Sequence, residues 1–324
     1  MILAGDIGGT KTNLGLFDLR DGALRAQDLQ SYPSRDHVGL EAIVHKFMAS
    51  KSAQVTAACF GVAGPVVDGQ SVTPNLPWIV NAENLARTLN LESVALINDL
   101  EATAHGIPAL KPEEMLTLNE GMVEEGNAAL VAAGTGLGVA SLFWDGSRHL
   151  PSASEGGHMD FAPRDPLEIE LLKYMFTKHS RVSIERVLSG PGLFNIYDFL
   201  RASGYGTEQP EIAARFAERD PSSVISQAAL AHTCKMCVKA LDMFAGIYGA
   251  TAGNIALTLK AIGGVHIGGG IAPKISEKLK DGTFIGAFMD KGRLSPLVAT
   301  IPVRVILNDK TALLGAARVA AQMQ

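Results

Sequence analysis

An acidic residue ends an apolar stretch near the start of the chain, and a glycine-rich turn follows it. The stretch Ile2–Asp6 leads into Gly8–Thr10 and then Lys11. Glycine lets backbone N–H groups surround an anion, and threonine and lysine add donors suited to phosphate. Asp6 could hold Mg²⁺ directly or through water, since this ion takes oxygen ligands and keeps several waters. A plain β-hairpin with a surface aspartate is the alternative, because short glycine turns commonly join strands.

Two further glycine clusters follow apolar runs. Gly134–Gly138 comes after Ala128–Ala133 and precedes Val139–Phe143, which has the pattern of a strand. A Rossmann motif would instead open a helix, so that interpretation is rejected. Two facing turns of this kind would clamp a polyphosphate. Gly268–Gly270 follows Val265–Ile267 and would admit a flat base or ribose. The alternatives are a hairpin turn for Gly134–Gly138 and a flexible loop for Gly268–Gly270.

An amide and a carboxylate end another strand candidate. Asn98 and Asp99 follow Val94–Ile97 and precede the helical pattern Leu100–His105. Asp99 is suited to take a proton from a substrate hydroxyl, and Asn98 can both donate to and accept from one hydroxyl. The alternative is that Asp99 caps the helix.

An acid and an imidazole share a glycine loop. Glu155 and His158 flank two glycines, and this pair suits hydrogen bonds to sugar hydroxyls. A metal site is the rival, but no cysteine-rich segment follows, so structural zinc is not expected. Glu185 could join the same pocket, or it could simply be an acid in the first turn of a helix. Asn75 could reach a ligand hydroxyl, and the nearby Trp78 could line a pocket or belong to the core.

Composition excludes several classes of protein. The chain has 324 residues and a net charge of −5, which argues against binding along a phosphate backbone. Three cysteines are too few for a disulfide scaffold and indicate a reducing compartment. Cys234 and Cys237 form a C-x-x-C within a helical pattern, where packing as small apolar groups is favoured over redox or zinc chemistry. The N-terminus lacks a signal-peptide pattern, and we expect a cytoplasmic enzyme.

Alternating strands and helices must position these residues, which predicts an α/β fold. Besides the strands above, we expect strands at Thr12–Phe17, Ala57–Val62 and Val303–Leu307. We expect helices at Leu40–Ser50, Ala82–Leu89, Pro166–Lys178, Ser223–Phe244 and Thr311–Gln324, and a buried helical segment at Met243–Leu259. Gly204–Pro221 is polar and has the composition of an exposed insertion.

The two strand–turn–strand patterns suggest a duplicated domain with a cleft between the copies. Gly8, Leu16 and Phe17 recur as glycine, leucine and phenylalanine 126 residues later. We place the junction near Pro108–Pro112, and we expect the last helix to pack back on the first domain. The expected domains are a small one, 1–109 plus 308–324, and a large one, 110–307.

These motifs together resemble bacterial glucokinase. The blocks occur in the family's order, nearly end to end, and the runs Glu155–Pro163 and Arg186–Leu193 are the most specific. The glycine loops alone are shared with actin, hexokinase and chaperone ATPases. The resemblance therefore implies a duplicated actin-like (ribonuclease H-like) ATPase fold, with MgATP as phosphoryl donor and D-glucose as acceptor.

The resemblance also assigns roles to individual residues. Asp99 corresponds to the catalytic base, and the glucose ligands would be Asn75, Asn98, Asp99, Glu155, His158 and Glu185. The ATP-binding residues would be Gly5, Asp6, Ile7, Gly8, Gly9, Thr10, Gly134, Thr135, Gly136, Gly269 and Gly270. Glucokinases of this group are often homodimers, which makes a homodimer the state that the resemblance suggests.

Two departures leave alternatives open. Ser154 stands where close relatives have glycine, and Lys11 is similar to the repressor/kinase (ROK) group, whose zinc-binding cysteines this chain lacks. A kinase for another hexose is therefore the nearest alternative. A non-catalytic sugar sensor would need a helix-turn-helix, and we expect no room for one before Ile2. An actin-like assembly ATPase would have no use for the sugar-binding set.

Overall fold

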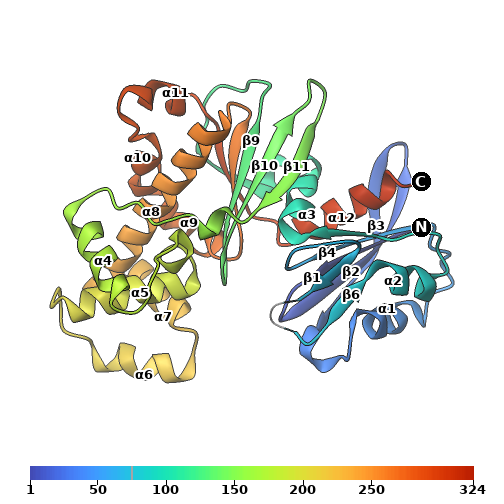
Figure 1. Ribbon diagram of the computed structural model, residues 1–324, viewed down its shortest axis with the longest axis horizontal. Helices are drawn as coiled ribbons and strands as arrows, with labels where there is room; N and C mark the ends of the chain where they lie inside the picture. Colours follow the sequence, from blue (N-terminus) through green and yellow to red (C-terminus); the bar gives the residue numbers. More distant parts are fainter. Residues whose placement is uncertain (74–75) are drawn as a thin grey trace. The chain divides into compact units, whose positions relative to one another are not determined.

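The computed structural model describes residues 1–73 and 76–324 and has a mixed α/β fold. The chain forms two compact units (Figure 1). Unit 1 comprises Met1–Pro112 and Asn308–Gln324, and unit 2 comprises Glu113–Leu307. The C-terminal segment thus returns to the first unit.

Unit 1 is built on a five-stranded sheet of order β3-β2-β1-β4-β7. Strands β1, β4 and β7 run parallel, whereas β2 and β3 are antiparallel neighbours that extend the sheet from β1. The strand bounds are β1 Ile2–Ile7, β2 Lys11–Arg20, β3 Ala23–Pro33, β4 Ala57–Val62 and β7 Ala95–Asn98. A separate two-stranded sheet pairs β5 (Gln70–Val72) with β6 (Ile79–Asn81).

Both faces of this sheet are covered, which explains the apolar runs Ile2–Gly5 in β1 and Ala57–Val62 in β4. Leu3 and Ile7 belong to one buried cluster, and Ile2 and Ala4 belong to another on the opposite face. Helices α1 (Leu40–Met48) and α2 (Ala82–Leu89) supply the first cluster. Helices α3 (Asp99–Gly106) and α12 (Thr311–Ala321) supply the second (Figure 1).

Helices α3 and α12 touch through their backbones. A β-carbon added at Gly106 would lie 2.0 Å from the carbonyl oxygen of Thr311, and one at Gly315 would lie 1.7 Å from that of Ala102. Only glycine permits this approach. The contact anchors the returning C-terminal segment beside the helix that begins at Asp99.

Unit 2 is built on a six-stranded sheet of order β11-β10-β9-β12-β13-β8. Strands β9, β12 and β13 are parallel, and the other neighbours pair antiparallel. The strand bounds are β8 Met115–Asn119, β9 Ala128–Ala133, β10 Leu137–Trp144, β11 His149–Ser154, β12 Gly264–Gly268 and β13 Val303–Ile306. Its first five strands therefore repeat the order and directions of the sheet in unit 1.

The long helix α8 of unit 2 packs against α5, α7 and α10, whereas α4 packs on α5 and α6 packs on α7. The helix bounds are α4 Pro166–Phe176, α5 Gly190–Ala202, α6 Pro210–Glu218, α7 Pro221–Leu230, α8 Lys235–Leu259, α9 Ser276–Lys280, α10 Thr283–Met289 and α11 Ser295–Ala299. Helix α8 is buried along most of its length, as the apolar segment Met243–Leu259 predicted. Within residues 1–73 and 76–324, no helix combines the length and apolar character needed to span a membrane.

One prediction of helical structure was wrong. The single helix expected over Ser223–Phe244 is broken between α7 and α8, where His232 adopts a left-handed φ of +53°. Cys234 caps the new helix, because its Sγ accepts from the N–H of Cys237 at 3.4 Å. The segment Gly204–Pro221 is mostly exposed, as its composition predicted, and it contains the helix α6, whose Ile212 is buried against the core.

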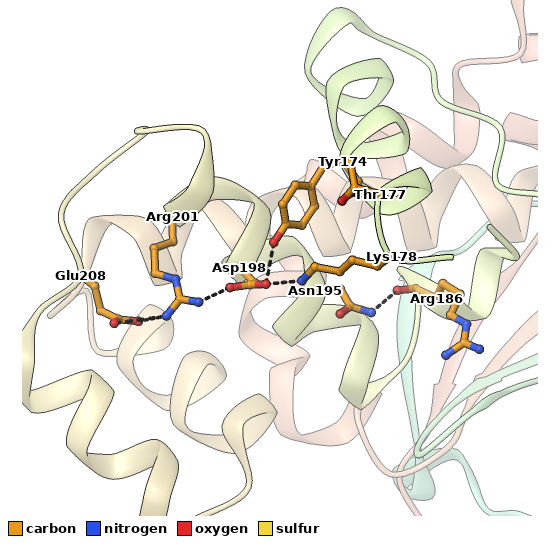
Figure 2. A network of polar contacts seen from close by, with 8 residues as sticks. All are labelled: Tyr174, Thr177, Lys178, Arg186, Asn195, Asp198, Arg201 and Glu208. Atoms are coloured by element: carbon orange, nitrogen blue, oxygen red, sulfur yellow. Dashed lines mark hydrogen bonds and ion pairs between the residues drawn. The ribbon is translucent and has the colours of Figure 1, made fainter. Parts of the chain in front are cut away.

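A buried carboxylate ties α4 to α5 (Figure 2). Asp198, 8% exposed, accepts a hydrogen bond from the hydroxyl of Tyr174 at 2.6 Å and forms ion pairs with Lys178 and Arg201. Arg201 also pairs with Glu208, at 3.2 Å. Burial opposes the charge of Asp198, but the bonds from Lys178 and Tyr174 and the nearby cations outweigh it and lower its pKa.

We expect Asp198→Asn to lower the free energy of unfolding by about 2 kcal/mol, because it leaves two cations and a hydroxyl facing an amide. Chemical denaturation measures this change. Glu170→Gln is the matched control: it breaks the exposed Lys173–Glu170 pair and should cost less than about 0.5 kcal/mol. Equal losses in the two variants would contradict the prediction.

Candidate functional site

Asp6 lies at the carboxyl end of β1, in register with Gly61 of β4. The side-chain amide of Asn13 donates to Asp6 Oδ2 at 3.0 Å, and Ser31 Oγ donates to the amide oxygen of Asn13 at 2.6 Å. Burial raises the pKa of Asp6, and the bond from Asn13 opposes that shift. One carboxylate oxygen is therefore held in place.

The first glycine turn, Gly8–Thr10, is held in place by Ser34, which lies 24 residues after Thr10 in the chain. Ser34 Oγ donates to the carbonyl of Gly8 at 2.7 Å, and the N–H of Ser34 donates to the carbonyl of Thr10 at 3.0 Å. Thr10 and Lys11 are exposed. Sequence reasoning missed both Ser34 and Asn13, because Ser34 meets the turn, and Asn13 meets Asp6, only once the strands have paired.

Two other residues assigned to this region are part of the core. Gly5 and Ile7 are buried within β1, and a β-carbon added at Gly5 would lie 2.3 Å from the ring of Phe60. They support the turn through the backbone of β1.

Asn98 and Asp99 form the start of α3, at the carboxyl end of β7. Asn98 is the N-cap: its Oδ1 accepts from the N–H of Leu100 at 2.9 Å, and its Nδ2 donates to the carbonyl of Gly64 at 3.1 Å. Asp99 is the first helical residue, so the alternative that it is the N-cap was wrong. Burial, with a smaller contribution from the charge of Asp6, raises the pKa of Asp99 to about 6.

Unit 1 thus gathers carboxylates at the carboxyl ends of its parallel strands. In residues 1–73 and 76–324, no three or more His, Cys, Asp or Glu side chains form a metal-binding group. Mg²⁺ does not require one, because it commonly takes one or two protein carboxylates and completes its shell with water and phosphate oxygens. The half-buried, oriented carboxylate of Asp6 fits that role.

In unit 2, the turn Gly134–Gly136 joins β9 to β10 and meets the start of α5. The N–H of Gly134 donates to the carbonyl of Gly136, and the N–H of Gly190 donates to the carbonyl of Gly134, both at 2.8 Å. Ser189 caps α5 by accepting from the N–H of Gly192 at 3.0 Å. The exposed Thr135 lies at the tip of the turn.

The turn after β12 packs directly against the end of β9. Gly269 has a left-handed φ of +81°, and a β-carbon there would lie 2.2 Å from the carbonyl oxygen of Ala133. Gly269 and Gly270 are both exposed. The structure therefore brings the two glycine clusters of unit 2 side by side.

Glu155 and His158 are exposed on the loop after β11. Residues Gly156–His158 form a 3₁₀ turn in which the N–H of His158 donates to the carbonyl of Glu155 at 3.0 Å. Ser154 braces the loop: its Oγ donates to the carbonyl of Val139 at 2.9 Å and accepts from the N–H of Gly156 at 3.2 Å.

Leu137 connects this loop to Glu185. A β-carbon added at Gly157 would lie 2.0 Å from the carbonyl oxygen of Leu137, and the N–H of Leu137 donates to Glu185 Oε2 at 2.8 Å. Glu185 also approaches the neighbouring glycine turn, because a β-carbon at Gly136 would lie 2.6 Å from its Oε2. The structure thus brings Glu185 to the same strand end as Glu155 and His158.

Asn75 and Trp78 were also singled out in the sequence. Asn75 lies outside the described residues. Trp78 is 3% exposed and its indole N–H donates to the carbonyl of His37 at 3.2 Å, so Trp78 is a core residue.

A cavity of about 120 Å³ in unit 2 is lined by Met159, Ile184 and residues of α8 among others. Its walls are mostly apolar, and it includes neither Glu155 nor His158.

Comparison with known proteins gives a consistent match along the chain. The family model described as Glucokinase matches residues 3–323. The glucokinase of Nostoc sp. is 43% identical over 340 aligned positions, covering 100% of this chain and 99% of that protein.

Solved structures agree. A glucokinase from an Antarctic psychrotroph superimposes with a TM-score of 0.88 at 29% identity, covering 99% of this chain and 98% of that one. The glucokinase of Balamuthia mandrillaris, solved in complex with glucose, shares the fold with a TM-score of 0.80 at 20% identity, covering 99% and 93% of the two chains. This chain belongs to the glucokinase family.

Proposed function

We propose that this protein transfers the γ-phosphoryl group of ATP to the 6-hydroxyl of D-glucose, forming glucose 6-phosphate and ADP. Membership of the glucokinase family over essentially the whole chain carries this proposal. The glucose bound to the Balamuthia enzyme supports the choice of sugar.

We assign the catalytic base to Asp99. Its carboxylate would accept the proton of the 6-hydroxyl as the oxygen attacks phosphorus. Its pKa of about 6 supports this role, because a base works best when its pKa is near the operating pH. The hydrogen bond from the N–H of Leu100 at 2.9 Å holds one carboxylate oxygen in orientation.

Nucleotide binding would fall to the three glycine turns. Gly8, Gly9 and Thr10 of the first turn, and Gly134, Thr135 and Gly136 of the second, would each bind phosphate, and Gly269 and Gly270 would lie at the adenosine. Backbone N–H groups at such turns favour anions. Asp6 would hold Mg²⁺, directly or through water, and the ion when bound neutralises charge on the phosphates.

Glucose would be bound by Asn98, Glu155, His158 and Glu185, together with Asn75. Support comes from the bridging role of Leu137, which joins the Glu155 loop to Glu185. Carboxylates and imidazole can pair with neighbouring sugar hydroxyls. Glu155 and His158 would sense whether the 2-hydroxyl is axial or equatorial.

We further infer that the two units are copies of one actin-like domain, with functional boundaries at 1–109 plus 308–324 and 110–307. The shared strand order of the two sheets supports this. The two hairpins also align at a spacing of 126 residues, since β1 and β9 have equivalent bounds. A homodimer and a cytoplasmic location stay predictions.

The test is ADP production with MgATP across glucose, mannose, fructose, glucosamine and N-acetylated sugars, each against a blank without sugar. We expect a selective rate with glucose. Preference for another hexose would overturn the sugar assignment and keep the kinase chemistry. A folded, ATP-binding protein without any sugar-dependent rate would overturn the proposal as a whole.

A further inference from the structure

The hydroxyl of Tyr248, midway along α8, meets three backbone groups at the ends of β9 and β12. Its oxygen lies 3.0 Å from the carbonyl oxygen of Val131 and 3.3 Å from that of Gly268, and it accepts from the N–H of Ala133 at 3.3 Å. The last register pair of these two strands is Gly268 with Ala132. The hydroxyl therefore lies where the paired strands end.

The ring of Tyr248 has a fixed position. It is fully buried, and it packs edge-on against Phe244 and Phe284 with ring centroids 6.1 and 5.5 Å away. A β-carbon added at the neighbouring Gly249 would lie 2.0 Å from the carbonyl oxygen of Phe284, so α10 is in direct contact with α8 here. Burial raises the pKa of Tyr248, which keeps its proton on the hydroxyl at neutral pH.

Both glycine turns of unit 2 leave from the groups that this hydroxyl contacts. Gly134 directly follows Ala133, and Gly269 directly follows Gly268. The turns also lie close together, because a β-carbon added at Gly269 would lie only 2.2 Å from the carbonyl oxygen of Ala133. A small shift between the strand ends would therefore move both turns.

We propose that Tyr248 is a positioning residue for ATP: its hydroxyl sets the spacing between the turns Gly134–Gly136 and Gly268–Gly270. This inference rests on the proposed function, which assigns those turns to the nucleotide. Tyr248 is buried and acts through the backbone, so it touches no ligand itself.

The test is Tyr248→Phe, which removes the hydroxyl and keeps the ring. We expect the Kd of a non-hydrolysable ATP analogue with Mg²⁺ to rise about three- to tenfold, the effect of one lost hydrogen bond. The Kd of glucose should stay within about twofold, because Glu155 and Glu185 are held through Leu137. Isothermal titration calorimetry measures both constants, and a general loss of structure would change both.

Tyr197→Phe is the matched control. Tyr197 is also fully buried in unit 2, and its hydroxyl donates to Glu208 at 3.3 Å, a residue outside both turns. We expect neither Kd to change. An unchanged analogue Kd in Tyr248→Phe, or an equal rise in Tyr197→Phe, would overturn the inference.

A second variant covers the case in which Tyr248→Phe does not fold. Phe284→Leu loosens the packing of the Tyr248 ring but keeps the hydroxyl, and it should raise the analogue Kd in the same direction without weakening glucose. No rise there would count against the inference. A wild-type protein that bound no analogue would overturn the proposed function as well, whereas normal wild-type binding with unaffected variants would overturn this inference alone.

Discussion

Asp99→Asn is expected to lower kcat by about 10²- to 10⁴-fold while glucose binds nearly as in the wild type. The asparagine oxygen can still accept from the N–H of Leu100, the bond that Asp99 Oδ1 makes at 2.9 Å, so the side chain keeps its place. What it loses is the ability to take a proton. Steady-state kinetics and calorimetric titration with glucose separate the two effects. A kcat near the wild-type value would show that Asp99 is not the base.

The same substitution should make the ligand-free protein more stable above pH 6. Burial raises the pKa of Asp99 from 3.8 to about 6, so the folded protein binds this proton more tightly than the unfolded chain does. The wild type therefore loses stability as pH rises from about 4 to about 6. Asparagine carries no charge, so the variant should gain up to about 3 kcal/mol above pH 6 and nothing below pH 4.

Urea denaturation at pH 4, 5, 6 and 8 tests this pH dependence. Asp36→Asn is the control: Asp36 is exposed in the same unit, and its replacement should change stability by less than about 0.5 kcal/mol throughout. A gain in Asp99→Asn that did not grow with pH would contradict the assigned origin of the pKa shift. Higher stability together with lost turnover is the typical result of replacing a catalytic group whose charged form is destabilised by burial.

Strands and helices were predictable where one physical signal dominates. β4 and β9 have the predicted bounds Ala57–Val62 and Ala128–Ala133, because strands buried on both faces form continuous apolar runs. β11, by contrast, is an exposed edge strand with a proline, and its sequence carries no such signal. α5 was missed because it begins Gly-Pro-Gly, although proline is favoured in the first turn after a capping serine.

The candidate site likewise has residues that could be predicted from the sequence and supporting residues that could not. Asp6 and Glu155 stand beside glycines and Asp99 follows a strand candidate, so these residues could be picked out along the sequence. Their supports could not, because Ser34 and Tyr248 reach the glycine turns only through tertiary contacts. Nothing in the local sequence distinguishes Tyr248 from an ordinary core aromatic.

Gly157→Ala is expected to raise the KM for glucose at least about tenfold, because the backbone leaves no room for a side chain there. The added β-carbon would lie 2.0 Å from the carbonyl oxygen of Leu137, a contact that only a backbone shift can relieve. The shift would move Glu155 and His158 away from Leu137, whose N–H holds Glu185 at 2.8 Å. The three proposed glucose ligands Glu155, His158 and Glu185 would then no longer be held in fixed positions relative to one another.

The matched control is Gly206→Ala in the same unit, where an added β-carbon meets no atom within 4 Å. It should leave the KM for glucose unchanged, whereas Gly157→Ala should weaken glucose more than the ATP analogue. A larger loss of glucose binding than of ATP-analogue binding would indicate that the sugar-binding loop has moved. Damage to the whole of unit 2 would weaken both ligands, because unit 2 also contains the nucleotide-binding turns. If Gly157→Ala weakened both ligands equally, the 155–158 loop would be a structural element of unit 2 and Leu137 would not link it to sugar binding. A selective loss of glucose binding would instead show that sugar binding depends on the backbone contact between Gly157 and Leu137. Substitutions of Glu155 or His158 would not reveal this dependence, because they leave that contact intact.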